Sequence, residues 1–360
     1  EMTSSLVGSE MCIRDRPAGK AAIRRAEQRE LLSRLAELAR SERADIVLLA
    51  GDIFDGGGTY FETGAEFVRC LRDMSVPVFI APGNHDPYDA RSPYAKLDIP
   101  QNVRIFTERD VECAELPELG VRVYGAAFTG STDGPDITNI RTERAEGTWN
   151  ILCAHGEVGF DPVNEQALSA SGLDYAALGH IHKASGLRRS GGTWYSWPGC
   201  PEGRGFDETG EKTVSIVELS DSGCRLTPVC IASRRYEILP VEVTGCDPLL
   251  AVHTVLPENT ARDVYRIVLT GEVDTPPDLS RLRRNLDDCF FSLQLRDETR
   301  LRQDVWERAE EDSLRGIFLR KLREKYNSAQ SEERELIEQA ARWGLAALDN
   351  MEEVVRHEDK

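Results

Sequence analysis

Four apolar runs in this chain lead into polar side chains of the kinds that bind metal ions, and this repeated arrangement constrains the fold most strongly. The runs cover residues 46–50, 76–81, 149–154 and 175–178, and they lead to Asp52, to Asn84 and His85, to His155, and to His180 and His182. An unbroken apolar run of this length is typical of a strand buried on both faces of a parallel sheet. Because ligands bind beyond the carboxyl ends of such strands, we predict that these side chains share one crevice.

The residue types at these strand ends indicate a divalent metal centre. A single histidine in such a place is more often a hydrogen-bonded loop residue, but four of the chain's six histidines follow these runs. Carboxylate, amide oxygen and imidazole together suit Mn, Fe, Zn or Co, whereas a thiolate site would contain cysteine ligands. The pattern therefore predicts a catalytic metal site in a layered α/β domain.

The order of these motifs resembles that of the calcineurin-like metallophosphoesterases, most of all the SbcD-type DNA repair exonuclease subunits. The family's series is D-x-H, G-D-x-x-D, G-N-H-D/E, an isolated H and G-H-x-H. All but the first occur here in that order, at residues 51–55, 83–86, 155 and 179–182. The resemblance implies a layered metallophosphoesterase β-sandwich flanked by helices.

By position, the resemblance also implies the metal ligands. Asp52 would bridge two divalent ions, for which we expect Mn. Asn84, His155 and His180 would complete the first ion's ligands, and His182 would bind the second. Two ions on one bridging carboxylate stabilise both the attacking and the leaving oxygen of an in-line displacement at phosphorus.

The remaining motif residues are expected to act in catalysis without binding metal. His85 resembles the family's catalytic histidine, which donates a proton or hydrogen bond to the phosphate or leaving oxygen. Asp55 resembles the carboxylate that orients this histidine, and such a partner would favour its charged form.

The N-terminal residues 1–16 fit no strand or helix period and do not form a signal peptide. They resemble a translated sequencing adapter, and the alternative is a disordered tail. In either case these residues contain no D-x-H motif, because Asp15 is followed by Arg16 and Pro17. We therefore expect the second metal site of this chain to be incomplete and its nuclease activity to be very low.

Composition limits the environment and the partners. The chain has 360 residues and a net charge of −18, which is unfavourable for coating DNA non-specifically, although bound cations and local basic patches can reverse the field inside a cleft. Candidate patches are Arg188 with Arg189, Arg234 with Arg235, and Arg281 with Arg283 and Arg284, although for each one taken alone ordinary solvated surface is the favoured interpretation. The nine cysteines lack metal-ligand spacing, and no apolar stretch is long enough for a membrane span. These features predict a cytoplasmic protein that does not contact membranes.

The pattern along the chain predicts three parts after the N-terminal tail. Residues 17–235 are expected to form the phosphoesterase domain, and its segments 193–197, 213–219 and 224–231 look like antiparallel strands. Residues 236–297 read as a β-α-β-α-β unit, the size and place of the small α+β cap domain in SbcD-like nucleases. The loop between segments 193–197 and 213–219 resembles the region after G-H-x-H in SbcD-like nucleases. Its residues Arg204 and Phe206 are candidates for contacting a phosphate and a base. A structured turn is at least as good an explanation of that loop.

Residues 298–360 are predicted to be helical, with two apolar stripes. The first contains Val305, Ala309, Leu314, Ile317, Phe318 and Leu322, and the second contains Leu336, Ile337, Ala340, Ala341, Leu348 and Met351. Such stripes belong either to a hairpin that packs on its own cap domain or to a docking element for a partner helix. The resemblance favours docking, because SbcD-like subunits bind the coiled-coil base of an SbcC-like ATPase through C-terminal helices.

These features give three functional hypotheses. The first is a metal-dependent DNA exonuclease or endonuclease subunit in DNA repair that binds DNA and an SbcC-like ATPase, with homodimerisation left open. The second is a stand-alone metallophosphatase acting on a nucleotide or a phosphoprotein. The third is a catalytically impaired scaffold. A small phosphatase needs neither a cap nor terminal helices, so the residues after Arg234 favour the first hypothesis.

Overall fold

The computed structural model describes residues 18–54, 61–137, 139–157, 164–273, 275–301 and 305–358. The chain divides into two compact units. The first contains residues 1–240, 255–268 and 280–296, and the second contains residues 241–254, 269–279 and 297–360. The predicted boundaries at residues 235 and 297 stay a prediction.

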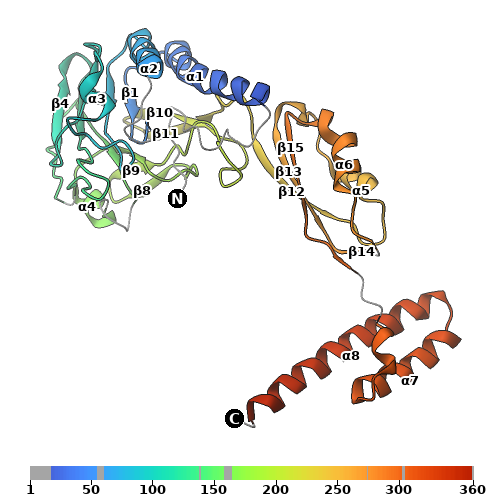
Figure 1. The fold of residues 1–360 in the computed structure, drawn as a ribbon. Helices are drawn as coiled ribbons and strands as arrows, with labels where there is room; N and C mark the ends of the chain where they lie inside the picture. Colours follow the sequence, from blue (N-terminus) through green and yellow to red (C-terminus); the bar gives the residue numbers. More distant parts are fainter. Residues whose placement is uncertain are drawn as a thin grey trace. The chain divides into compact units, whose positions relative to one another are not determined.

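Two stacked β-sheets form the centre of the first unit (Figure 1). The smaller sheet has the order β1-β2-β3 and consists of β1 (Val47–Leu49), β2 (Val78–Ile80) and β3 (Val103–Ile105), all parallel. The larger sheet has the order β4-β5-β6-β7-β9-β8 and consists of β4 (Glu112–Leu116), β5 (Val121–Gly125), β6 (Trp149–His155), β7 (Tyr175–Gly179), β8 (Arg188–Ser190) and β9 (Thr193–Ser196). In the larger sheet β5, β6, β7 and β9 run parallel, and the outer strands β4 and β8 run antiparallel to their neighbours.

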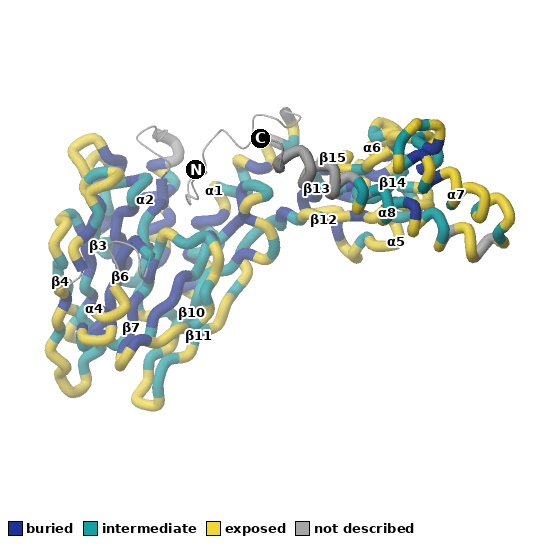
Figure 2. The backbone as a smooth tube through the Cα atoms, turned by 90° about the horizontal axis from the view of Figure 1, so that it is seen from below, coloured by how far each residue is buried: buried dark blue, intermediate teal, exposed yellow. Residues whose placement is uncertain are grey.

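Three apolar layers hold these sheets and their helices together. Helices α1 (Ala18–Ser41) and α2 (Phe61–Asp73) cover the smaller sheet around buried side chains such as Phe67 and Ile80. Phe79 and Cys153 lie in the core between the two sheets. The short helices are α3 (Pro93–Lys96) and α4 (Glu165–Ala170), and Leu168 of α4 packs in the core of the larger sheet. Buried residues accordingly follow the strands in Figure 2, and the predicted layered α/β fold is confirmed.

The predicted antiparallel strands after His182 are confirmed in part. Strands β10 (Val214–Ser220) and β11 (Gly223–Val229) form an antiparallel hairpin. The predicted strand at residues 193–197 is present as β9, which is antiparallel to β8 but parallel to β7. The reversal is made by β8, which pairs antiparallel with β9 at the sheet edge.

A three-stranded sheet with two helices follows, as predicted. It consists of β12 (Tyr236–Glu242), α5 (Pro248–Val255), β13 (Val264–Thr270), α6 (Leu279–Leu286) and β15 (Ser292–Asp297), with strand order β12-β13-β15. The short strands β14 (Glu272–Val273) and β16 (Arg300–Leu301) form a separate parallel pair. This β-α-β-α-β succession is the one that the apolar pattern predicted.

The C-terminal residues form two helices, α7 (Leu314–Ser328) and α8 (Ser331–Glu358). Ser313 caps α7 by accepting a hydrogen bond from the Gly316 N–H. Leu319 and Ala341 are buried between the helices, together with Val305 and Ala309. Other apolar side chains remain exposed, namely Leu314 (67%), Ile317 (48%), Leu336 (68%) and Trp343 (71%). Only part of the predicted apolar stripes is therefore used in packing within this region. Among the described helices, none is long and apolar enough to cross a membrane.

Candidate metal centre

The ends of four strands meet around His155, the last residue of β6. Its Nδ1 lies 2.8 Å from the Ala50 carbonyl oxygen, beyond the end of β1. Its Nε2 lies 3.0 Å from Asn84 Oδ1 and 3.3 Å from Asp52 Oδ2. The ring of His180, which follows β7, is 5.3 Å from the His155 ring between centroids. The structure therefore brings together the four side chains that the resemblance assigns to the first metal ion.

Glycines let these strand ends approach so closely. A Cβ on Gly179 would lie 1.7 Å from the Ala50 carbonyl oxygen. Gly51 has φ +83° and faces His155, and a Cβ there would lie 2.5 Å from His155 Nδ1. Since both spaces exclude a side chain and Gly51 also needs a left-handed backbone, the apolar runs must end in glycine here.

Asp86 holds the turn that carries Asp52. Asp52 itself has φ +53°, an uncommon conformation for a residue with a side chain. The buried Asp86 carboxylate accepts hydrogen bonds from the backbone N–H groups of Asp52 (3.0 Å), Ile53 (2.7 Å) and Phe54 (3.1 Å). It also accepts one from the N–H of Gly83 (2.7 Å) and one from the Tyr94 hydroxyl (2.5 Å). Five donors on one carboxylate fix this turn.

The hydrogen bonds of His155 leave one ring nitrogen directed at the oxygen ligands. Because Nδ1 donates to the Ala50 carbonyl, the neutral ring carries its lone pair on Nε2, towards Asn84 and Asp52. Burial alone would lower the pKa of His155, but its contacts with Asp52 and the carbonyl raise it. Burial alone would likewise raise the pKa of Asp52, but its contacts with His155 and with the His85 N–H lower it. These shifts favour a proton on His155 Nε2 beside an ionised Asp52, and a cation bound at this place would take the position of that proton.

His182 is held by a carboxylate of a later loop. Its Nδ1 lies 2.8 Å from Glu208 Oε1, and Glu208 is only 4% exposed. The second Glu208 oxygen accepts the backbone N–H of Arg204 at 2.9 Å. Metal-binding histidines commonly donate their other ring N–H to a carboxylate in this way, which leaves Nε2 free as a ligand. His182 therefore has the environment of a ligand for the second ion.

These donors suit a divalent cation. Three ligand atoms of Asp52, Asn84 and His155 converge, and a lone pair that faces two oxygens is stabilised when a cation lies between them. Within the part of the chain that the structure describes, no three His, Cys, Asp or Glu side chains form a group ready to hold a metal ion. The converging set depends on the Asn84 amide, and the His180 ring lies edge-on to His155 beside it. The roles of all five predicted ligands stay predictions.

His85 lies beside this set, and its backbone N–H donates to Asp52 Oδ1 at 3.0 Å. Its side chain is half-buried. Asp55, the predicted partner of His85, falls outside the described residues. The structure therefore places the predicted catalytic histidine at the cluster.

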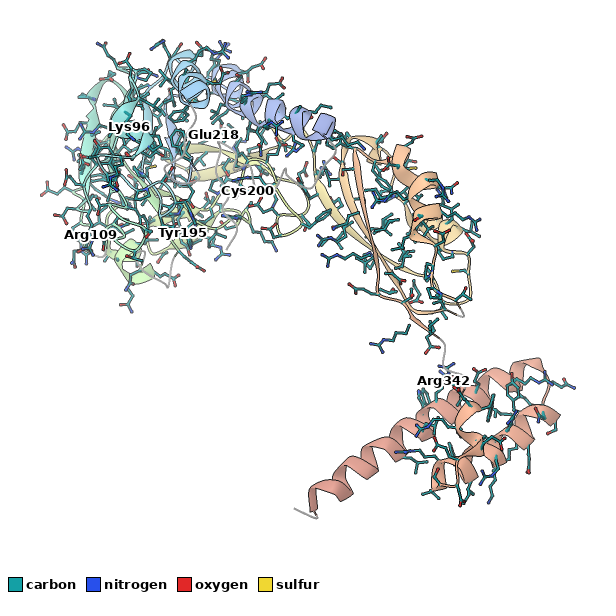
Figure 3. The ribbon with its side chains drawn as sticks, viewed as in Figure 1. Lys96, Arg109, Tyr195, Cys200, Glu218 and Arg342 are labelled. Carbon is teal, nitrogen blue, oxygen red and sulfur yellow. The ribbon has the colours of Figure 1, made fainter. Side chains whose placement is uncertain are left out.

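The loop of residues 198–212, which contains the Cys200 labelled in Figure 3, is anchored to helix α1. Arg24, only 1% exposed, forms a buried ion pair with Glu202 of this loop. Arg204 is 7% exposed, and Phe206 packs edge-on against Tyr236 while Arg266 lies 4.0 Å above its ring. Arg204 and Phe206 are thus both engaged within the protein, and their predicted contacts with substrate stay a prediction.

Sequence reasoning missed two groups at this site, Glu208 and the Asp86–Tyr94 pair. The G-N-H-D motif contains Asp86 but does not indicate which groups it binds. Tyr94 and Glu208 belong to no motif, and their partners lie 8 and 26 residues away, at Asp86 and His182. The loop of residues 198–212 contains several carboxylates, so its composition alone does not identify Glu208.

An apolar cavity of about 270 Å³ adjoins the site. It lies beside β1, which in the described part of the chain pairs only with β2. Leu49 of β1, Leu178 of β7 and Ile216 of β10 line it, and it extends to His155 and His180. The cavity therefore runs along the open edge of the strand that leads to Asp52.

Residues 24–184 match the family model of the calcineurin-like phosphoesterases. This range includes every predicted metal ligand. The chain contains a calcineurin-like phosphoesterase domain. The family match and the layered α/β fold both support a phosphoesterase domain, in addition to the order of the motifs.

Relatives of this phosphoesterase resemble it at low identity over much of its length. It is 25% identical over 283 residues to the uncharacterized metallophosphoesterase YhaO of Bacillus subtilis, a match that covers 72% of this chain and 68% of that protein. It is 23% identical over 269 residues to the DNA double-strand break repair protein Mre11 of Saccharolobus solfataricus, covering 68% and 69%. It is 32% identical over 114 residues to one component of the nuclease SbcCD, the SbcD polypeptide of Rhodobacter capsulatus, covering 30% and 23%.

Proposed function

We propose that this chain is a metal-dependent DNA nuclease subunit that hydrolyses phosphodiester bonds in DNA repair. The observation that carries the proposal is the convergence of Asp52, Asn84 and His155 in a phosphoesterase domain. The relatives named as DNA repair protein and nuclease support DNA as the substrate. The test is cleavage of a DNA end in Mn²⁺, compared with hydrolysis of nucleotides and phosphopeptides. Preference for either of the latter would favour the phosphatase alternative.

The residues of the site would have different roles in metal binding, proton donation and positioning. Asp52, Asn84, His155 and His180 would hold one divalent ion, and Asp52 and His182 would hold the other. When bound, such ions activate water and stabilise the charge that develops around phosphorus. His85 would hydrogen-bond to the phosphate or donate a proton to the leaving oxygen. Asp86 and Glu208 keep Asp52 and His182 in position through the hydrogen bonds described above.

We expect the 360-residue chain to bind one Mn²⁺ tightly and a second one weakly. Of the predicted ligands, four would bind the first ion, whereas two, Asp52 and His182, would bind the second. An ion with two protein ligands must fill its shell with water and competes poorly with bulk solvent. Calorimetry and elemental analysis would measure the stoichiometry, and two ions bound at micromolar affinity would contradict the expectation. Replacing residues 1–16 with a strand that ends in Asp-x-His should restore the second ion, and the cavity beside β1 offers that strand a place.

The exposed apolar side chains of α7 and α8 support docking to a partner, which we propose is an SbcC-like coiled-coil ATPase. Leu336 and Trp343 are seven residues apart, so they share one face of α8. Leu314 and Ile317 are three residues apart and share one face of α7. An apolar helix face of this kind suits a partner helix better than solvent.

Deleting residues 304–360 should leave a folded phosphoesterase domain that no longer co-purifies with such an ATPase. The double variant Leu336→Asp and Trp343→Asp should also lose the partner while keeping its helix content by circular dichroism. Leu250→Asp is the matched control, since Leu250 of α5 is 64% exposed but lies outside these helices. Retained co-purification after the deletion would refute docking, and aggregation of the truncated chain would show that the helices serve internal packing.

A further inference from the structure

The strand register places Arg188 in the outer strand of the larger sheet, on the side towards the candidate metal ligands. Strands β6, β7 and β9 are parallel, so their carboxyl ends share one edge. Strand β8 is antiparallel to β9, with Arg188 opposite Tyr195 and Ser190 opposite Thr193. Tyr195 pairs in turn with Ala176 of β7, so the Arg188 backbone lies about 10 Å to the side of β7 and four residues short of His180. Its long side chain covers part of that distance, because it reaches Trp197, two residues beyond Tyr195.

An indole ring connects Arg188 to the metal centre. The Arg188 guanidinium carbon lies 5.6 Å from the centroid of the Trp197 ring. Trp197 is only 2% exposed, and its indole N–H donates to the carbonyl oxygen of Gly156 at 3.0 Å. Gly156 directly follows His155. The Arg188 guanidinium thus packs on a buried indole ring, and that ring is hydrogen-bonded to the residue after His155.

Two cations on this side of the larger sheet lack an acidic partner. Arg188 is exposed, as is Lys183, which directly follows His182. Within the described part of the chain, neither forms an ion pair with a carboxylate, whereas Arg24, Arg34 and Arg234 all do. In a chain with a net charge of −18, uncompensated cations beside a metal centre mark a place where an anion is attracted.

We propose that Lys183 and Arg188 form a phosphate-binding track that holds the DNA strand flanking the scissile phosphodiester; this rests on the proposed nuclease function. A nucleic-acid strand presents phosphates about every 3.4 Å along the duplex axis. The Arg188 backbone is about 10 Å sideways and about 13 Å along the strands from His180, or about 16 Å in all. A strand whose scissile phosphate lies at Asp52 and His155 would therefore present a phosphate several nucleotides away to Arg188. Lys183 lies closer in sequence to the ligands, and Arg188 would contact a more distant phosphate.

Arg189 provides a matched control. It is exposed like Arg188 and also stacks on an indole, with its guanidinium carbon 4.9 Å from the centroid of the Trp194 ring. Successive side chains of a strand point to opposite faces, so Arg189 carries the same charge on the other face of β8. It is also one residue further from the edge that bears the metal ligands.

The test measures binding of the full chain to a fluorescein-labelled duplex end at about 50–200 mM salt, without added divalent metal. Arg188→Ala should weaken binding several-fold and reduce the slope of log affinity against log salt by about 1. Lys183→Ala should act similarly, Arg188→Lys should keep most of the affinity, and Arg189→Ala should change neither quantity.

Two results would overturn the inference alone. One is an Arg188→Ala variant with unchanged affinity and salt slope, and the other is an equal loss in Arg189→Ala, which would indicate unspecific surface charge. Absence of DNA binding by the unaltered chain, together with hydrolysis of bis(p-nitrophenyl) phosphate, would instead overturn the nuclease proposal and the track with it.

Discussion

Replacing His85 with alanine should lower the rate of phosphodiester hydrolysis by about 10²–10⁴-fold while leaving metal binding largely intact. The backbone N–H of His85 donates to Asp52 Oδ1, and the substitution retains this hydrogen bond. His85 is half-buried, and its imidazole is close enough to Asp52 to lower the pKa of that carboxyl group. Because the ligand atoms stay in place, the loss should appear in kcat.

The measurement uses bis(p-nitrophenyl) phosphate and Mn²⁺, in the chain whose residues 1–16 are replaced by a strand ending in Asp-x-His. That background provides enough activity to quantify the loss. His253→Ala is the control, since His253 lies exposed on α5. Loss of bound metal in His85→Ala, or unchanged activity, would show that the assigned role is wrong.

Replacing Asp86 with alanine should destabilise the fold by about 4 kcal/mol or more, among the largest effects of a single substitution. It would leave four backbone N–H groups and the Tyr94 hydroxyl without their acceptor in a buried place. Each unsatisfied buried group costs about 1–3 kcal/mol. Burial and the neighbouring Asp52 carboxylate raise the pKa of Asp86. The hydrogen bonds from Tyr94 and from the backbone N–H groups act in the opposite direction and partly offset the cost of burying this carboxylate.

Urea unfolding of the variants would measure this cost. Tyr94→Phe removes one of the five donors and should cost only about 1–2 kcal/mol, because Asp86 keeps the other four. Asp86→Asn should be nearly as harmful as Asp86→Ala, since its amide NH₂ would face N–H donors. Asp98→Ala, at an exposed site later in the same segment, should stay within about 0.5 kcal/mol. A small change in Asp86→Ala would mean that the Asp52 turn is held by other contacts.

The sequence predicted the centre of the fold because local rules determine it. A buried parallel strand must be apolar throughout, and a close approach at its end requires glycine, so the runs that end at Gly51 and Gly179 could be recognised without a structure. The convergence of Asp52, Asn84 and His155 follows from that geometry.

The remaining features depend on contacts that no local pattern encodes. The direction of β9 is set by β8, a three-residue edge strand that the apolar pattern did not indicate. The contact of Glu208 with His182 depends on the path of a loop anchored through Arg24, a residue of a helix far away in the sequence. The division of the C-terminal apolar residues into buried and exposed sets likewise depends on how α7 and α8 pack.

The cavity beside β1 gives solvent access to the strand that leads to Asp52. This space of about 270 Å³ opens to the surface, and within the described part of the chain β1 pairs only with β2. The backbone N–H groups of β1 that do not pair with β2 therefore face a space that water can enter. Their hydrogens should exchange with deuterium faster than those of β6 and β7, which are paired on both sides in the larger sheet.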